Sequence, residues 1–413
     1  MNSKPVVDQL YSIQLQGNKR KVISLDLCRI KNCLEYLGNP QDKFKSVLIG
    51  GTNGKGSVTY YLSNLACKYS DLKVGRYISP HLVSWNERFV INEKIVDSFL
   101  LENIKKEVIE QILDFEKNNN ETLTEFELYT TIAFYLFAKE GVDIAFLEVG
   151  MGGRLDATNV VSAKNTLCSI ITNISLDHIE YLGDTVEKIA FEKAGIIKEN
   201  GFVVSGAREQ ALEVIRSKSS ELKSKLVVVD TEENNFYQNK NIKIVKASWK
   251  VICDSELKQS IRKVSEVEKN NFLKSLQFSG RFQYINEHKI LLDGAHNPQA
   301  GKELRKLIDK DFSSKKIIYI LGMLDKDHES FIKNLLPYNS TVICTEPKSI
   351  RATGKEVLAR CVVDNGSNAN ISSDLQSAIQ FAKSMEHDII IITGSLYLVG
   401  EALQCLKNQV SFP

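Results

Sequence analysis

GGTNGKGS at residues 50–57 decides the fold, because it follows an apolar run at residues 46–49 and precedes a helical pattern at residues 56–67. Its glycines let the backbone bend so that successive N–H groups face one anion, and a helix N-terminus adds partial positive charge. In such a loop Lys55 reaches the terminal phosphates of a nucleotide, and the Ser57 hydroxyl binds Mg²⁺. A glycine-rich turn without a ligand is the alternative, but it explains neither the lysine nor the serine.

The same order of strand, turn and helix recurs along the chain. Apolar residues 142–149 run into a glycine-rich turn, and residues 166–174 precede Asp177, His178 and a helical pattern at residues 185–195. Such units predict a parallel sheet with helices on both faces, in which ligands bind beyond the carboxyl ends of the strands. Because the unusual polar residues fall at those ends, we expect the functional site there.

A second α/β region follows a polar stretch at residues 208–241 and a mainly helical stretch at residues 240–281. Its apolar runs are at residues 289–292, 316–321, 341–344 and 388–393. We place the domain boundary near residues 279–285. The predicted class is therefore α/β, with a P-loop-type, mostly parallel sheet in a domain at residues 1–280 and a smaller Rossmann-like α/β domain at residues 281–413.

The composition excludes several classes of protein. The 413 residues carry a formal net charge of +2, too small for a large nucleic-acid footprint, so we expect no nucleic-acid partner. No apolar run approaches the roughly 18 residues that span a bilayer, so we expect no membrane partner. The eight cysteines have no close metal-binding spacing, and residues 1–17 do not resemble a signal peptide, which together predict reduced thiols in a cytoplasmic protein.

Two side chains at predicted strand ends are candidate metal ligands. Glu148 ends the apolar run at residues 142–149 and faces the phosphate loop if the two strands are neighbours. His178 follows the next strand, directly after Asp177. Mg²⁺ prefers oxygen ligands, and an imidazole ligand makes the site something other than a purely oxygen cage. Two alternatives stay open: a strand-end glutamate paired with a lysine, and a histidine that serves only the fold.

Four motifs occur in order along the chain: GTNGKGS at residues 51–57, SPHL at residues 79–82, LEVGMGGRLDATN at residues 147–159 and DGAHNP at residues 293–298. They resemble motifs of the Mur-ligase superfamily, and within it of the folylpolyglutamate synthase and dihydrofolate synthase branch. In the first motif Gly56 separates Lys55 from Ser57, which departs from the common P-loop spacing and matches this family.

Four weaker matches extend the resemblance. They are TEFE at residues 124–127, YQNKN at residues 237–241, SGRFQ at residues 279–283 and TGSLY at residues 393–397. Tyr237 stands where the family has histidine, and Ser279 stands where it has proline. TEFE also fits a helix capping box, which needs no chemistry. The resemblance implies that residues 1–280 form a Mur-ligase-like ATP-binding domain and residues 281–413 a glutamate-ligase domain.

The resemblance also implies roles for individual residues. ATP would be bound by Thr52, Asn53, Gly54, Lys55, Gly56, Ser57, Asn241, Arg281 and Asp293. The metal ligands would be Ser57, Glu148, His178 and Lys193. The substrate would meet Ser79, Pro80, His81, Phe126, Arg154, Asp156, His296 and Ser395. The catalytic residues would be Lys55, Lys193, Asp293 and His296. For Arg154 and Asp156 a simple turn is an equal alternative.

Lys193 lies in IAFEKAGII at residues 189–197, a predicted helix. A plain ammonium there would be repelled by metal ions, and a solvent-exposed helix lysine is the alternative reading. The family carbamylates the matching lysine, which reverses its charge and supplies two oxygen ligands. The resemblance therefore implies a carbamylated Lys193, two Mg²⁺ ions and a monovalent cation as cofactors besides ATP.

The implied activity is that of an ATP-dependent carboxylate–amine ligase. It would add L-glutamate to dihydropteroate, giving dihydrofolate, or to reduced folates, giving folylpolyglutamates, through an acyl phosphate. The alternatives are a cell-wall Mur-type amino-acid ligase, which carries a separate domain before the phosphate loop, and a P-loop nucleotide-binding protein without ligase activity. We expect a monomer with small-molecule partners, while the acceptor, the polyglutamate length and the oligomeric state stay open.

Overall fold

The computed structural model describes residues 25–231, 237–325 and 327–409. Within these ranges no helix has the length and apolar character needed to cross a membrane. Residues 1–17, in which we expect no signal peptide, lie outside the described part of the chain.

The chain divides into two compact units, each with its own sheet. Unit 1 contains the chain up to His81 and Trp85–Ser275, and unit 2 contains Leu82–Ser84 and the chain from Leu276 onward. The division therefore comes slightly before the predicted boundary at residues 280/281, because the backbone of the linker packs on unit 2: the Gly294 N–H donates to the Gly280 carbonyl at 2.9 Å. The assignment of ATP binding and glutamate ligation to separate domains remains a prediction.

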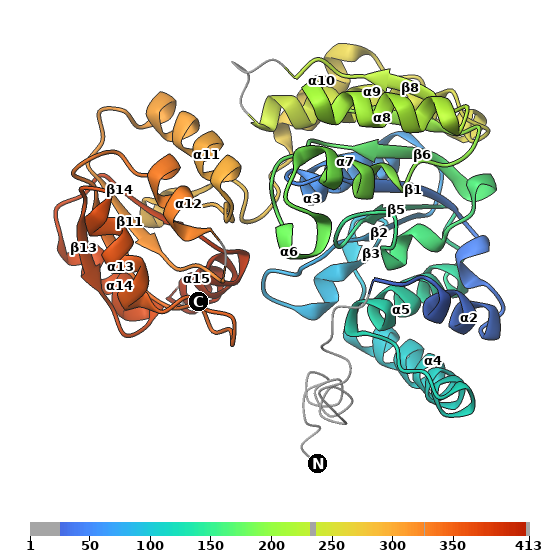
Figure 1. Ribbon diagram of the computed structural model, residues 1–413, viewed down its shortest axis with the longest axis horizontal. Coiled ribbons are helices and arrows are strands. Elements are labelled where there is room, and N and C mark those ends of the chain that lie inside the picture. Colours follow the sequence, from blue (N-terminus) through green and yellow to red (C-terminus); the bar gives the residue numbers. More distant parts are fainter. Residues whose placement is uncertain (1–24, 232–236, 326, 410–413) are drawn as a thin grey trace. The chain divides into compact units, whose positions relative to one another are not determined.

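Unit 1 is built on an eight-stranded sheet in the order β4-β3-β2-β5-β1-β6-β7-β8 (Figure 1). The strands are β1 (Lys45–Gly50), β2 (Val74–Tyr77), β3 (Phe89–Ile91), β4 (Lys94–Ile95), β5 (Ile144–Glu148), β6 (Thr166–Ile171), β7 (Phe202–Ser205) and β8 (Lys225–Val228). All neighbours pair in parallel except β2 with β3 and β3 with β4. The predicted mostly parallel sheet is confirmed.

Helices cover both faces of this sheet. They are α2 (Cys28–Tyr36), α3 (Lys55–Tyr69), α4 (Ser98–Asn119), α5 (Glu125–Lys139), α6 (Ile179–Leu182), α7 (Val186–Ala194), α8 (Glu209–Glu221), α9 (Tyr237–Cys253) and α10 (Glu266–Ser275). One face packs on α2, α5, α7 and α8 in a continuous apolar core that includes Leu48 and Leu147. The helices α3 and α9 contact the strands but contribute nothing to that core, so they lie on the other face.

Unit 2 is a smaller six-stranded sheet in the order β13-β12-β11-β14-β10-β9, parallel except at β9. Its strands are β9 (Gln283–Ile285), β10 (Ile290–Leu292), β11 (Ile317–Leu321), β12 (Thr341–Cys344), β13 (Asn368–Ile371) and β14 (Ile389–Thr393). Its helices are α11 (Pro298–Asp311), α12 (His328–Leu335), α13 (Lys355–Asp364), α14 (Leu375–Ser384) and α15 (Leu396–Gln409). Along β14, Ile389 and Ile391 face α11 to α13, and Ile390 and Ile392 face α14 and α15. The predicted Rossmann-like α/β architecture is confirmed.

Candidate functional site

Four adjacent parallel strands of unit 1 bring the predicted site residues to one edge of the sheet. β1 lies between β5 and β6, and β2 lies on the far side of β5. In register, Ile49 of β1 pairs with Glu148 of β5, and Gly50 pairs with Ile171 of β6. The predicted neighbourhood of Glu148 and the phosphate loop is therefore confirmed, because both follow the carboxyl ends of paired strands.

The backbone shape of the phosphate loop is fixed by the conformations of its glycines and by hydrogen bonds to the loop that follows β6. Gly51 and Gly54 have φ angles of 130° and 87°, which favour glycine. The Asn53 N–H donates to Asn173 Oδ1 at 2.9 Å, and the Thr172 hydroxyl donates to the Asn53 carbonyl at 2.7 Å. The loop backbone is thus fixed by contacts 119 to 120 residues away in sequence.

Asn241 of α9 lies directly against this loop. A Cβ atom added to Gly54 would stand 2.5 Å from Asn241 Oδ1. Asn241 is buried, so its amide is held beside the loop at which we expect the nucleotide. Gly54 is needed both for its positive φ and for this close approach.

We expect Gly54→Ala to raise the KM for ATP about 10-fold, because left-handed backbone costs roughly 1–2 kcal/mol for a residue with a Cβ and the new methyl meets Asn241. Gly38→Ala is the matched control: its φ is 78°, but a Cβ there meets nothing within 4 Å. Steady-state kinetics at varied ATP compare the two. An unchanged KM in Gly54→Ala would contradict this account of the loop.

Lys55 and Ser57 sit in the first turn of α3. The Lys55 ammonium donates to the carbonyls of Gly51 and Thr52 at 3.2 and 3.1 Å, so it folds back over the loop it belongs to. Ser57 is buried. An ammonium held by two carbonyls of its own loop can exchange these contacts for phosphate oxygens.

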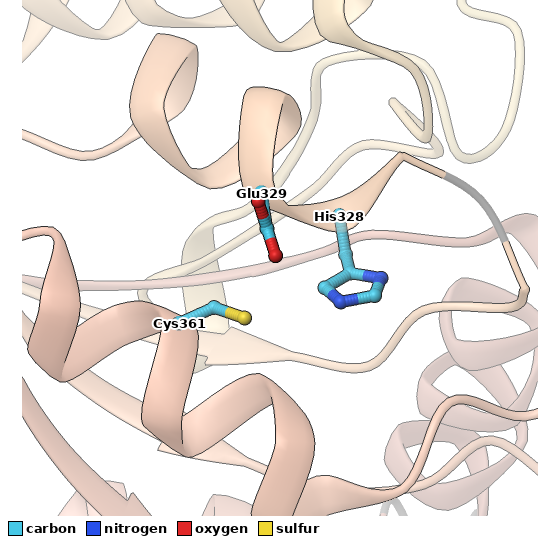
Figure 2. A group of neighbouring side chains, drawn as sticks. All are labelled: His328, Glu329 and Cys361. Carbon is cyan, nitrogen blue, oxygen red and sulfur yellow. The ribbon is translucent and has the colours of Figure 1, made fainter.

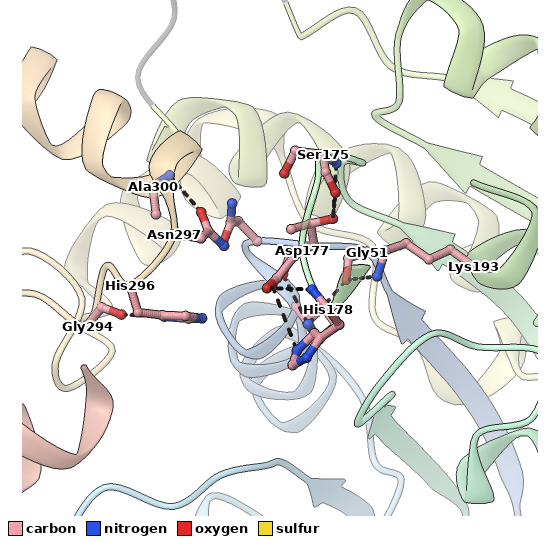
Figure 3. A network of polar contacts seen from close by, with 12 residues as sticks. Gly51, Ser175, Asp177, His178, Lys193, Gly294, His296, Asn297 and Ala300 are labelled. Carbon is pink, nitrogen blue, oxygen red and sulfur yellow. Dashed lines mark hydrogen bonds and ion pairs between the residues drawn. The ribbon is translucent and has the colours of Figure 1, made fainter. Parts of the chain in front are cut away.

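Lys193 comes from α7 and is buried against the phosphate loop (Figure 3). Its ammonium donates to the Gly51 carbonyl at 2.9 Å, across 142 residues of sequence. Burial, together with the positive charge of Lys55, lowers the pKa of Lys193 to about 7. The alternative of a solvent-exposed helix lysine is therefore wrong, since Lys193 is only 3% exposed.

Lys193 lines a small pocket with members of the three loops after β1, β5 and β6. The lining residues are Gly51, Thr52, Lys55, Val149, Gly150, Met151, Gly152, Asp177, His178 and Lys193. Neither Ser57 nor Glu148 is among them. The carboxylate, hydroxyl and imidazole groups around this edge suit a hard divalent ion, whereas two neighbouring ammonium groups do not. The site therefore fits such an ion best when Lys193 is uncharged or carries a negative group.

Two carboxylates at this edge, Glu148 and Asp177, accept hydrogen bonds from backbone N–H groups. Glu148 Oε2 accepts from the Ser79 N–H at 3.0 Å, and Asp177 Oδ1 accepts from the His178 N–H at 3.0 Å. His178 has a φ of 51° and lies 3.9 Å from Asp177 Oδ2 through its Nε2. Asp177 was absent from the predicted ligands, although it lines the pocket. Its position at a strand end, next to a candidate histidine, was the available signal.

The substrate candidates Ser79, Pro80 and His81 follow β2. The peptide between Ser79 and Pro80 is cis. His81 Nδ1 accepts from Arg88 Nε at 3.1 Å. Burial, followed by the Arg88 charge, lowers the pKa of His81 to about 4, so the ring is neutral at physiological pH.

This neutral histidine predicts a loss of stability in acid. Because the pKa of His81 is lower in the folded than in the unfolded chain, stability falls as the pH drops from about 6.5 towards 4. Between pH 7 and pH 5 the loss attributable to His81 is at most about 2 kcal/mol, and His81→Gln should lack it. Urea unfolding followed by tryptophan fluorescence reports unit 1 alone, since Trp85 and Trp249 both lie there. Equal pH dependence in wild type and His81→Gln would refute the assignment.

The candidates Phe126, Arg154 and Asp156 surround the turn after β5. The Phe126 ring lies against Gly150, where an added Cβ atom would stand 2.5 Å from the ring. Arg154 pairs with Glu192 at 2.9 Å, and 44% of its side chain is exposed. Asp156 is buried and accepts from the N–H groups of Met151 and Thr158 at 2.9 and 3.0 Å. These contacts fit the alternative of a structural turn for Asp156, and its substrate role remains a prediction.

The four predicted site residues of unit 2 lie at the carboxyl ends of β10 and β14. Asp293 is buried and accepts from the N–H groups of Phe282 and Ala295 at 2.7 and 2.9 Å. His296 Nδ1 lies 2.9 Å from the Gly294 carbonyl (Figure 3). The Arg281 guanidinium reaches the same turn, since its Nη1 would stand 2.5 Å from a Cβ on Gly294.

Two helix starts complete this edge of unit 2. Asn297 caps α11 by accepting from the Ala300 N–H at 2.9 Å, and Pro298 occupies the first turn. Ser395 is buried before α15, where its hydroxyl accepts from the Leu398 N–H at 3.1 Å. Asp293, His296, Arg281 and Ser395 therefore belong to one edge of one sheet.

Comparisons with known proteins match most of the chain. The Mur ligase middle domain matches residues 49–288, and the C-terminal domain of dihydrofolate synthetase matches residues 277–405. Dihydrofolate synthetase of Saccharomyces cerevisiae is 32% identical, over 94% of this chain and 99% of its own length. Dihydrofolate synthase/folylpolyglutamate synthase of Bacillus subtilis is 29% identical, over 95% of this chain and 97% of its own length.

Solved structures resemble the chain over similar lengths. E. coli FolC in complex with DHPP and ADP has a TM-score of 0.84 at 25% identity and covers 99% of both chains. The bifunctional folylpolyglutamate synthase/dihydrofolate synthase of Yersinia pestis, with AMPPNP and a Mn ion, has a TM-score of 0.82 at 27% identity. It covers 97% of this chain and 98% of its own.

Proposed function

The chain belongs to the dihydrofolate synthetase family, and from this premise we propose that it is an ATP-dependent ligase that joins L-glutamate to the carboxylate of dihydropteroate or of a reduced folate. The observation that supports this most is the buried Lys193, which meets the phosphate loop at Gly51. A plain nucleotide-binding loop has no use for a second, buried lysine with a lowered pKa. The same observation fits a carbamate far better than it fits a structural ammonium.

The chemistry follows from the poor leaving ability of a carboxylate oxygen. A carboxylate oxygen of the acceptor attacks the γ-phosphorus of ATP, the bond from that phosphorus to the β-phosphate oxygen breaks, and ADP leaves. The amine of glutamate then attacks the carbonyl carbon of the acyl phosphate. Phosphate departs with the electrons of the C–O bond, and the amine loses its proton. Positioning and charge neutralisation supply most of the catalysis in such transfers.

Several candidates in unit 1 have roles in these reaction steps. Lys55 neutralises charge on the transferring phosphoryl group, and the N–H groups of residues 52–57 hold the other phosphates. Asn241 contacts the nucleotide beside Gly54. His81, Phe126 and Arg154 lie on the acceptor side of the site.

The candidates in unit 2 have the complementary roles. Asp293 and Arg281 contact the nucleotide, with Arg281 donating to phosphate. His296 and Ser395 hold the incoming glutamate. Asp293 contacts the Phe282 N–H, so it also fixes the backbone beside Arg281.

We further propose that Ser57, Glu148, His178 and a carbamylated Lys193 hold Mg²⁺, as two ions, with a monovalent cation as an additional cofactor. When bound, Mg²⁺ neutralises the phosphates and polarises the γ-phosphoryl group. The Yersinia pestis structure with a Mn ion supports a divalent ion in this family. Because the pKa of Lys193 is about 7, a large share of this side chain is the neutral amine at neutral pH. The neutral amine is the form that reacts with carbon dioxide.

The acceptor can be decided with the purified chain. ATP, Mg²⁺ and L-glutamate are supplied with either dihydropteroate or a reduced folate, and ADP release and product mass are measured. We expect glutamate-dependent ADP release with dihydropteroate and a product heavier by one glutamyl residue. Turnover with the reduced folate as well would make the chain bifunctional, like the Bacillus subtilis relative in name. Nucleotide turnover without any pterin acceptor would reject the proposal in favour of a non-ligase nucleotide-binding protein.

We propose that the enzyme is a cytoplasmic monomer whose partners are small molecules. Its eight cysteines are all free, as expected for a reducing compartment, and its net charge of +2 gives no broad surface for nucleic acid. Size-exclusion chromatography with light scattering tests the oligomeric state, and a stable dimer would overturn that part of the proposal.

A further inference from the structure

A second cluster of metal-binding side chains lies in unit 2, on α12 and α13. His328 and Glu329 open α12, and Cys361 lies in α13. A nitrogen of His328, a carboxylate oxygen of Glu329 and the sulfur of Cys361 all lie within 4.8 Å of one another. Figure 2 shows the three side chains turned towards a common point. None of them belongs to the four motifs or to the proposed ligase site.

The two helices hold this cluster in place through their buried faces. Phe331 and Leu335 of α12 pack with Leu358 and Val362 of α13 in one apolar core. Asp327 caps α12 by accepting from the Ser330 N–H at 3.1 Å, which fixes the first turn where His328 and Glu329 stand. The backbone positions of the three side chains are therefore set by the core rather than by the cluster itself.

The donor set selects the class of ion. An imidazole, a thiolate and a carboxylate are the ligands that Zn²⁺ takes in proteins, whereas Mg²⁺ takes oxygen. In a tetrahedral site with Zn–S of about 2.3 Å and Zn–N of about 2.0 Å, neighbouring ligand atoms stand roughly 3.5 Å apart. Because the three ligand atoms lie within 4.8 Å of one another, the cluster needs to contract by at most about 1.3 Å. Rotation of Glu329, whose side chain is exposed, supplies such a movement.

Ordinary surface chemistry explains only part of the cluster. An acidic side chain in a first helical turn is favoured by the helix dipole, which accounts for Glu329. It does not account for an imidazole and a thiol from two different helices at the same point. The soft thiolate of Cys361 beside the imidazole of His328, a ligand of intermediate softness, is instead typical of a transition-metal site.

We propose that His328, Glu329 and Cys361 bind a Zn²⁺-class ion that joins α12 to α13, with water as the fourth ligand. This site is separate from the Mg²⁺ proposed beside the phosphate loop, whose candidate ligands include no sulfur. The ion links two helices on one face of the unit 2 sheet and takes no part in the ligase chemistry. The inference stands whether or not the proposed function is correct.

Cobalt(II) can replace Zn²⁺ in such sites, and its absorption spectrum depends on which ligands it binds. Titration of the full chain with Co²⁺, under reducing conditions, should give a near-ultraviolet thiolate-to-cobalt charge-transfer band that saturates at one ion per chain and is displaced by Zn²⁺. Co²⁺ at the phosphate-loop site gives no such band, because no thiol is among its candidate ligands. A wild-type chain without the band would overturn the proposal.

Three variants make the assignment specific. Cys361→Ser and His328→Ala should abolish the band, and Glu329→Gln should weaken Co²⁺ binding at least about 10-fold. Cys405→Ser is the matched control, since Cys405 is also a half-buried free thiol of unit 2. Circular dichroism and ligase turnover check that the variants fold. A band that survives in Cys361→Ser, or is lost in Cys405→Ser, would place the metal elsewhere and reject this site.

Discussion

Lys193→Met should abolish ligation and, at the same time, stabilise the metal-free protein at pH 7. The fall in kcat should be about 10³-fold or more, because the variant can neither hold the metal nor form a carbamate. The gain in unfolding free energy should be on the order of a few kcal/mol, since a buried ammonium beside Lys55 is removed. A residue that harms stability and is required for activity is the signature of a functional group.

The pH dependence of this gain follows from the pKa of Lys193. Its folded-state pKa, about 7, lies below the ordinary 10.5, so the unfolded chain binds more protons between these values. Wild-type stability should therefore rise from pH 7 towards pH 10, and the advantage of Lys193→Met should shrink over the same range. Urea unfolding in buffers free of carbon dioxide measures this. An advantage that does not change with pH would contradict the lowered pKa.

Lys198→Met is the matched control for this experiment. Lys198 is also buried, and burial lowers its pKa to about 8, but it donates to Asn159 at 2.8 Å and does not reach the phosphate loop. Its replacement should alter stability and leave kcat within about 3-fold of wild type, as expected for a residue outside the site. Loss of turnover in both variants would mean that Lys193 acts through the fold alone.

Rescue by small molecules tests the sign of the charge at Lys193. Lys193→Ala leaves space at the end of the side chain, and a short carboxylate such as propionate can occupy it with its oxygens towards the metal. If the working group is a carbamate, carboxylates should restore part of the turnover and short amines should not. Rescue by amines alone would instead support an ammonium.

Lys55→Met is expected to reduce kcat about 10³-fold while the protein keeps its fold. Lys55 donates to carbonyls of its own loop, Gly51 and Thr52, so these contacts are available for exchange with phosphate. Lys68→Met, an exposed lysine in the last turn of the same helix, should leave kcat unchanged. Rapid-quench measurement of ADP formation compares them. Wild-type rates in Lys55→Met would remove this lysine from phosphoryl transfer.

The sequence predicted those parts of the fold in which the local signal is strong. The strand at Lys45–Gly50, the glycine loop and the helix at Lys55–Tyr69 form one continuous pattern of apolar run, turn and helix. The strand at Ile389–Thr393, which begins with four consecutive isoleucines, was equally clear. In each case burial on both faces of a parallel sheet demands a continuous run of apolar residues.

Elements without such a signal were missed. Phe89–Ile91 and Lys94–Ile95 are too short for a periodic pattern, and they pair antiparallel at the edge of the sheet. Asn368–Ile371 lies at the edge of the other sheet, and two of its four residues are asparagines, so it has no continuous apolar run. The helix Glu209–Glu221 was read as a polar stretch, since it buries only a narrow stripe that includes Ala211 and Ile215.

The candidate site shows the same limit. Lys55 and Ser57 could be found from their spacing within one loop, but nothing in the spacing of Lys193 placed it 2.9 Å from the Gly51 carbonyl. That contact depends on how α7 packs on the sheet, and only the resemblance to a family anticipated it. Asp177 was passed over because a carboxylate at a strand end is common, and only its position in the pocket distinguishes it.

We propose that this chain activates a carboxylate by transferring the γ-phosphoryl group of ATP to it. Dihydropteroate labelled with oxygen-18 in its carboxylate tests the claim directly, by mass spectrometry of the phosphate released with ATP and L-glutamate. We expect one labelled oxygen to appear in phosphate for each amide formed, and no labelled phosphate from Lys193→Met. Amide formation with phosphate that carries no label would contradict it.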